Sequence, residues 1–226
     1  MREIKITNMS AVIWCKSKFN QSYNYINIDT LVLKDGVNIL TGEIDSGGWG
    51  VSYMLSMADY DKKMLPGCPN DEMKIFIDGE WVRLSEVCKN ACYMDRCYPL
   101  FSSKRKVSSM VANALKKSGV PYTVEEVRQL FNISDFRFER PLSGVGNEIF
   151  RCMAAIGTAA GKGMFCFPWM SALHLGYYQR QLFDPIETLA KIGKTIILPR
   201  TAGEAERVNV VTRSENNWTQ GDISLS

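Results

Sequence analysis

The stretch NILTGEIDSGGWGVSYML, residues 38–55, decides the fold. An apolar run ends in a glycine-rich loop, and the chain then continues with apolar residues at helical spacing, beginning at Val51. A strand, a glycine loop and a helix in this order are the context of a phosphate-binding loop. Such a loop needs a lysine followed by serine or threonine to hold the phosphate and its metal, but Gly48 and Trp49 stand at these positions.

Length and composition indicate one globular domain over residues 1–226. Hydrophobic residues make up 46% of the chain and charged residues 23%, as in ordinary globular proteins. The net charge of +3 argues against a nucleic-acid partner. No apolar run is long enough to span a bilayer, and the N-terminus alternates like a strand and lacks the apolar core of a signal peptide. We therefore expect a cytoplasmic location.

The cysteines predict neither a disulfide framework nor a metal site. There are seven, an odd number, scattered along a domain-sized chain. Cys88, Cys92 and Cys97 are spaced C-x3-C-x4-C, which matches no common zinc pattern, and the single histidine is His174. We expect no bound metal and reduced, mostly buried thiols.

The remaining pattern alternates between strands and helices. Strands are expected at 2–7, 25–32, 37–40, 164–167 and 195–198, with a hairpin over 73–84 that turns at Asp78-Gly79. Helices are expected at 51–58, 107–117, 145–160 and 175–192, with another one that begins after Thr123, its N-cap, with Glu126 in a capping box. The alternation predicts an α/β fold with a mainly parallel sheet.

The order of these features resembles the nucleotide-binding domain of ATP-binding cassette (ABC) transporters. The resemblance implies a P-loop NTPase-like ABC ATPase fold, with a mainly parallel central sheet and an antiparallel N-terminal β part. It also implies a small helical subdomain at about 97–150, and it leaves a polar C-terminal tail at about 203–226.

Five segments carry the resemblance. Gly42, Ser46 and Gly47 match the phosphate loop, and Leu142, Ser143 and Gly144 match the signature motif. The segment 91–101 resembles the Q-loop region, 162–174 the Walker B strand and the loop that follows it, and 193–201 the strand that ends at the switch histidine.

The departures from the family fall on its catalytic groups. Gly48 and Trp49 replace the phosphate-loop lysine and hydroxyl residue, Phe167 and Pro168 the Walker B carboxylates, Arg96 the Q-loop glutamine, His174 an aspartate and Thr201 the switch histidine. Asp45 also places a negative charge in the loop. Phosphoryl transfer depends on positioning and charge stabilisation. We therefore expect no catalytic residue and no cofactor for this chain alone.

The signature-like triplet allows a different role. In the family this motif closes over ATP held by the facing subunit, so Leu142, Ser143 and Gly144 could act on ATP and Mg²⁺ at an interface with a competent partner. A helix beginning near Val145 would aim its N-terminus at that phosphate. In the alternative interpretation, the triplet is a helix-start loop with Ser143 as cap.

Aromatic residues leave two interpretations open. Trp49, Phe167 and Trp169 form an aromatic ligand pocket, or they fill a vacated nucleotide site. The residues that lie where the family stacks an aromatic ring on adenine are Trp14, Phe19, Tyr23 and Tyr25.

The sequence thus predicts a catalytically degenerate cassette subunit of an ABC transporter. Its partners would be a second cassette subunit, in a homodimer or heterodimer, and a transmembrane permease docked near 93–101. It would lie peripherally on the inner face of the membrane and serve peptide export or immunity. The alternatives are a stand-alone scaffold or regulatory protein that binds no nucleotide, and an ATPase that uses unusual groups.

Overall fold

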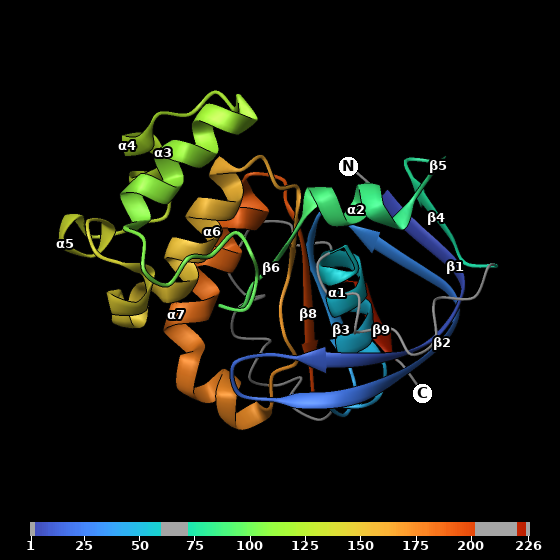
Figure 1. The fold of residues 1–226 in the computed structure, drawn as a ribbon. Helices are drawn as coiled ribbons and strands as arrows, with labels where there is room; N and C mark the ends of the chain where they lie inside the picture. Colours follow the sequence, from blue (N-terminus) through green and yellow to red (C-terminus); the bar gives the residue numbers. More distant parts are fainter. Residues whose placement is uncertain (1–2, 60–71, 202–220, 225–226) are drawn as a thin grey trace.

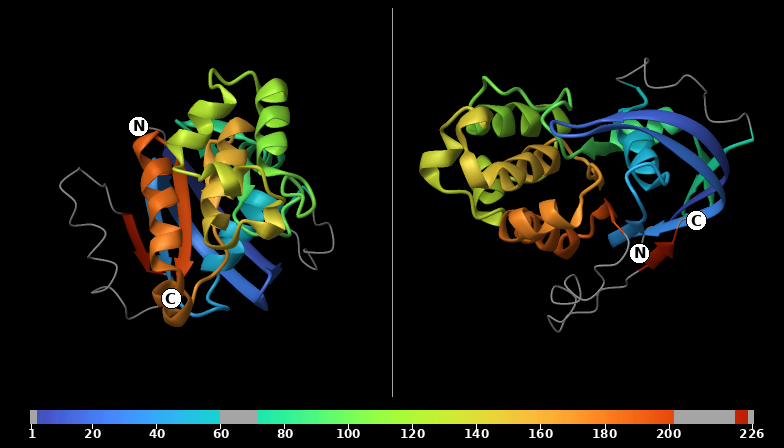
Figure 2. Two further views of the ribbon diagram at one scale, coloured as in Figure 1. Left: turned by 90° about the vertical axis from the view of Figure 1, so that its left-hand side faces the viewer. Right: turned by 90° about the horizontal axis from the view of Figure 1, so that it is seen from below.

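The computed structural model describes residues 3–59, 72–201 and 221–224, and in it two β-sheets enclose one central helix (Figure 1). Helix α1 (Gly48–Met57) lies between the sheets, and every one of its residues is buried. A group of helices lies on the side away from the antiparallel sheet (Figure 2). The arrangement confirms the predicted α/β class with an antiparallel N-terminal part.

The antiparallel sheet has the order β2-β1-β4-β5. Its strands are β1 (Glu3–Lys16), β2 (Gln21–Lys34), β4 (Lys74–Ile77) and β5 (Glu80–Val82). The predicted turn at Asp78-Gly79 is confirmed, and both residues have positive φ.

The first two strands are much longer than the predicted segments 2–7 and 25–32. Each has 14 residues, and they pair over their whole length as one hairpin. Asn8, with φ of 54°, interrupts the alternation, but Met9, Ala11 and Ile13 continue the buried face beyond it. The hairpin therefore reaches across α1 toward the start of α7 (Figure 1), where the Phe19 ring at its tip lies 6.0 Å from that of His174.

The parallel sheet has the order β6-β7-β8-β3-β9. Its strands are β3 (Gly36–Thr41), β6 (Ala91–Tyr93), β7 (Met164–Cys166), β8 (Thr195–Arg200) and β9 (Gly221–Ser224). The apolar strand β7 is wholly buried and is flanked on both sides, as predicted. Strand β9 pairs with β3, so the tail expected over 203–226 contains a strand.

The helices are α2 (Leu84–Asn90), α3 (Val107–Ser118), α4 (Val124–Leu130), α5 (Asp135–Phe138), α6 (Ile149–Ala159) and α7 (Ala172–Lys191). The capping box of α4 is confirmed, because Thr123 Oγ1 accepts from the Glu126 amide at 3.2 Å. Helices α3, α4 and α5 gather beyond α6 (Figure 1). The boundaries of this helical subdomain, at about 97–150, stay a prediction.

The helix expected from Val145 begins instead at Ile149. Two short 3-10 turns, η2 (Leu142–Gly144) and η3 (Gly146–Glu148), come before it. Gly146 has φ of +59°, which an α-helix cannot accommodate, so the regular helix begins only after it. Within the described ranges, no helix is both long enough and apolar enough to cross a bilayer.

Candidate functional site

The glycine loop connects β3 to α1, and within it the Ser46 side chain folds back onto the loop backbone. Ser46 Oγ donates to the Glu43 carbonyl oxygen at 2.8 Å, and the Ser46 amide donates to the same oxygen at 3.1 Å. A Cβ added to Gly42 would lie only 2.0 Å from Ser46 Oγ. Gly42, Ser46 and Gly47 thus lie together as predicted, with the serine hydroxyl folded back over the first glycine.

Strand β2 lies directly against this loop and the first turn of α1. The Tyr25 amide donates to the Asp45 carbonyl oxygen at 3.3 Å, and the Gly50 amide donates to Asn24 Oδ1 at 3.1 Å. A Cβ on Gly47 would be 2.7 Å from the Tyr25 carbonyl oxygen. The amides of a helix N-terminus are what a phosphate loop offers its ligand. Here one of them is taken by an asparagine of the same chain.

Trp49 lies in the first turn of α1, directly after the glycine loop. Its side chain is fully buried, and its indole Nε1 donates to the Tyr93 hydroxyl at 2.9 Å. That hydroxyl in turn donates to the Lys16 carbonyl oxygen at 3.1 Å. Burial, and then the nearby Asp95 carboxylate, hold the pKa of Tyr93 well above its usual range, so this phenol stays neutral and remains a donor.

Two aromatic residues of the Walker B-like segment, Phe167 and Trp169, contact α1 and the glycine loop. Phe167 is fully buried, and its carbonyl oxygen accepts from Ser52 Oγ of α1 at 2.5 Å. Trp169 Nε1 donates to the Gly42 carbonyl oxygen at 3.1 Å, which ties this segment to the start of the glycine loop. The contacts of Trp49 and Phe167 favour the interpretation that bulky groups fill a vacated site.

The aromatic candidates for adenine stacking lie on the hairpin. Tyr23 and Tyr25 are exposed on the outer face of β2, and the Trp14 ring lies 4.6 Å from the Tyr23 ring in a cross-strand pair. Phe19 is exposed at the hairpin tip, with its ring 6.0 Å from that of His174. The four residues are thus spread over the hairpin.

The signature-like triplet forms η2 and not a helix N-terminus. Leu142 is buried, Ser143 is exposed and caps no helix through its side chain. The Ser143 amide donates to the Ser103 carbonyl oxygen at 3.2 Å, and the Gly144 amide to that of Pro141 at 2.7 Å. The helix start predicted near Val145 and the cap predicted at Ser143 are therefore wrong, because α6 begins five residues after the triplet ends. A role of the triplet toward ATP on a partner subunit stays a prediction.

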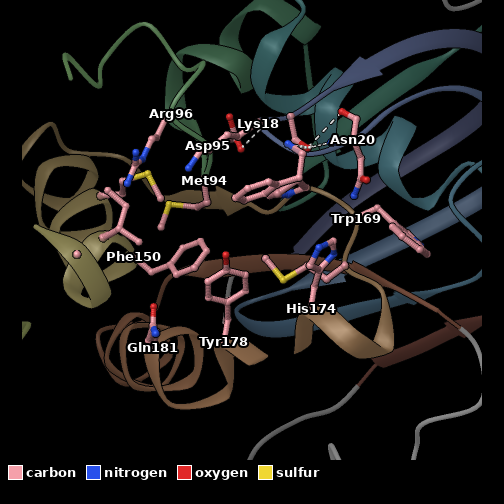
Figure 3. Close-up of a pocket in the computed structure, with 17 residues that line it drawn as sticks. Lys18, Asn20, Met94, Asp95, Arg96, Phe150, Trp169, His174, Tyr178 and Gln181 are labelled. Atoms are coloured by element: carbon pink, nitrogen blue, oxygen red, sulfur yellow. Dashed lines mark hydrogen bonds between the residues drawn. The ribbon is translucent and has the colours of Figure 1, made fainter. Parts of the chain in front are cut away.

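A cavity of about 160 Å³ lies beside this region (Figure 3). Its walls come from the hairpin tip at 17–20, the loop 94–96 after β6, helix α6, residues 168–170 and helix α7. We refer to it as the aromatic cavity. Sequence reasoning missed it, although His174, Tyr178 and Gln181 recur at helical spacing on one face of α7.

The cysteines of the C-x3-C-x4-C segment are separated by burial. Cys88 and Cys92 are buried and Cys97 is exposed. Burial raises the pKa of the Cys88 thiol to about 11, so it is protonated at neutral pH. Among the described residues no cluster of three or more histidine, cysteine or acidic side chains could hold a metal.

Comparisons with solved structures place the fold. The chain is similar to a Pyrococcus furiosus protein described as an ABC transporter ATP-binding protein, with 12% identity, a TM-score of 0.59, and coverage of 90% of this chain and 94% of that one. It is also similar to a dimeric ATP-binding cassette in a post-hydrolysis state with ADP and Pi, at 13% identity and a TM-score of 0.58, with 92% and 90% covered. A bacterial ABC exporter with ATP bound matches at 15% identity and a TM-score of 0.54, where the chain covers 35% of that protein.

The sequence matches no family model and no curated protein. The fold is nevertheless that of an ABC transporter ATP-binding cassette domain, as the resemblance of the motifs predicted. At such low identity the likeness defines the fold alone, and function has to be argued from the site.

Proposed function

We propose that this chain is a cassette-fold subunit that binds no nucleotide by itself and acts through pairing with a competent cassette subunit and a transmembrane permease. The observation that carries the proposal is the seating of β2 on the glycine loop, through the Tyr25 amide and the Asn24 side chain. The loop retains its glycines, but the Gly50 amide is already bonded to Asn24, and β2 lies in close contact with Gly47.

The residues present lack the groups that binding of ATP and Mg²⁺ requires. Gly48 and Trp49 supply neither a cation nor a hydroxyl, and Phe167 and Pro168 supply no carboxylate. The buried Trp49 side chain fills the space beside the start of α1, and its indole Nε1 donates a hydrogen bond to the Tyr93 hydroxyl there. Hydrolysis at this chain's own site is therefore not proposed.

Pairing with another subunit is supported by apolar side chains in the open. Leu173 and Tyr177, one turn apart at the start of α7, are 80% and 76% exposed, and Phe19 of the hairpin tip lies close by, beside His174. Exposed apolar groups gathered on one face favour an interaction surface. Two of the solved neighbours are a dimeric cassette and an exporter, which motivates this choice of partner. In such an assembly the chain would lie on the cytoplasmic face of the membrane, with ATP and Mg²⁺ bound only at the partner's loop; peptide export or immunity is the transport role we expect.

The second candidate is a stand-alone scaffold of the same fold. It is favoured by the amides of Ser143 and Gly144, which already donate within the chain and are not free to meet a phosphate. In that case the cassette fold would serve protein interaction only.

Calorimetric titration of the purified chain with Mg-ATP, together with measurement of its mass in solution, tests the proposal. We expect no binding up to millimolar ATP and hydrolysis at background. Saturable ATP binding that is lost on Gly47→Ala would overturn it. Coexpression with a competent cassette subunit and a transmembrane permease then separates the two candidates: a defined complex supports the subunit, and a monomer that binds neither supports the scaffold.

A further inference from the structure

We propose that the aromatic cavity binds a small planar aromatic anion of about one ring, such as an aromatic carboxylate. The cavity is lined by side chains from five separate segments, which converge between the hairpin tip and α7 (Figure 3). A concave site with a few converging polar groups is where proteins commonly bind a small ligand.

Size and shape favour a single flat ring. The volume of about 160 Å³ is close to the roughly 150 Å³ of an engineered cavity in another protein that takes up benzene. The rings of Phe150 and Tyr178 meet edge to face at 6.0 Å, and the His174 ring lies 6.5 Å from that of Tyr178. Aromatic walls in such arrangements accept another ring with offset or edge contacts.

Part of the cavity lining can adapt to the ligand. Met94, Met153 and Met170 all line the cavity, and their unbranched thioether side chains adjust to a ring at little cost. Figure 3 shows Met94 above the space and Tyr178 below it. The ligand would lie between the Tyr178 ring and the adjustable Met94 side chain.

Charge at the cavity favours an anion. The Asp95 carboxylate is already engaged, since its Oδ2 accepts from the Lys18 amide at 3.0 Å and its Oδ1 from the Cys97 amide at 3.0 Å. Arg96 also lines the cavity, and with the described residues its guanidinium makes no hydrogen bond or ion pair. Lys18 adds a second cation, with its Nζ 4.7 Å from the Phe19 ring centroid. A carboxylate can take both bonds of the Arg96 fork.

The hairpin tip is preorganised as one wall. The Ser17 amide donates to the Asn20 carbonyl oxygen at 2.8 Å, and the Asn20 amide donates to Ser17 Oγ at 3.1 Å. Because the turn is already ordered, a ligand would not have to fix it on binding. No residue of the glycine loop 42–47 lines the cavity, and ligand binding there does not require a partner subunit.

The test uses 4-fluorobenzoate as the probe and 4-fluorobenzyl alcohol as its uncharged counterpart. Binding of each compound is measured by fluorine NMR and by calorimetry. We expect saturable binding of the carboxylate below about 1 mM, as befits a ligand of this size. The alcohol should bind at least fivefold more weakly. Arg96→Gln should weaken the carboxylate at least fivefold, whereas the control Arg105→Gln, at an exposed arginine outside the cavity, should change it less than twofold.

A substitution that fills the cavity provides a second test. Gln181 is partly exposed and lines the cavity, so Gln181→Trp should fill it without disturbing the core, and should abolish binding while the melting temperature stays unchanged. Unchanged binding in Gln181→Trp, or no saturable binding of the carboxylate, would overturn the site. Equal affinity for the alcohol and the carboxylate would contradict the preference of the cavity for an anion. Displacement of the probe by ATP would mean a remnant nucleotide site and would also overturn the proposal.

Discussion

The indole of Trp49 donates a hydrogen bond to the hydroxyl of Tyr93 at 2.9 Å, where both side chains are fully buried. Tyr93 belongs to the parallel sheet, and its hydroxyl donates onward to the Lys16 carbonyl oxygen in the antiparallel sheet. One chain of hydrogen bonds thus connects the central helix to both sheets. The tryptophan that follows the glycine loop therefore contributes to the stability of the fold.

Trp49→Phe should destabilise the protein by about 1–3 kcal/mol. The substitution removes the donor to Tyr93 and part of a buried ring, and both losses are felt in a closely packed interior. Urea unfolding followed by circular dichroism measures the change. Trp81→Phe is the matched control, because Trp81 is 58% exposed, and it should stay within about 0.5 kcal/mol. Equal effects of the two variants would contradict the role assigned to Trp49.

Gly47→Ala should cost at least about 2 kcal/mol of stability. Gly47 has φ of +94°, and a Cβ there would be 2.7 Å from the Tyr25 carbonyl oxygen, so backbone strain and a steric clash act together. Gly79→Ala is the control for strain alone, since Gly79 has φ of +85° with nothing within 4 Å. We expect the control to cost roughly half as much. Thermal unfolding of the two variants side by side gives the comparison; a Gly79 loss as large as that of Gly47 would mean that β2 does not lie tightly on the loop.

Asn24→Ala should destabilise by about 1–3 kcal/mol, because it leaves the Gly50 amide buried without an acceptor. Asn27→Ala, at an exposed position of the same strand, should be close to neutral. Hydrogen exchange adds a local readout, since protection of the Gly50 amide should fall in the first variant only. Unchanged protection in Asn24→Ala would show that the side chain does not hold the helix start.

Much of the fold could be predicted from local patterns. The glycine loop between a buried strand and a helix, the Asp78-Gly79 turn and the capping box of α4 are local features, and each lies where predicted. Their physical causes act over a few residues: positive φ at glycine, a side-chain cap, and the spacing of apolar groups.

The site itself could be predicted only in part. The sequence places Trp49 directly after the glycine loop, but its partner Tyr93 is 44 residues away. The packing that joins the two side chains could not be predicted from the sequence. The covering of the glycine loop depends on the length of the β1–β2 hairpin, which the break at Asn8 concealed. The helix start at the signature-like triplet was misjudged because Gly146 inserts 3-10 turns.

Leu142→Ala and Ser143→Ala should separate structure from interaction within the signature-like triplet. Leu142 is 1% exposed, so its truncation should cost about 2–4 kcal/mol through a cavity. Ser143 is exposed, and its truncation should leave the stability of the isolated chain within about 0.5 kcal/mol. In a complex with a competent cassette, Ser143→Ala should lower that partner's ATPase rate if the triplet is lent across the interface. An unchanged rate would favour the scaffold.

Restoring the missing residues should not restore nucleotide binding. The double variant Gly48→Lys with Trp49→Ser returns the lysine and the hydroxyl to the loop, yet β2 would still hold the Asp45 carbonyl through the Tyr25 amide. We expect no saturable binding of Mg-ATP by calorimetry, because the cradle stays covered. Loss of the Trp49 indole should cost about 3–5 kcal/mol, so folding has to be verified by circular dichroism. The variant that keeps Trp49 and carries Gly48→Lys alone is the control for added charge. Tight ATP binding by the double variant, with the single variant inactive, would mean that the residues and not the strand keep nucleotide out.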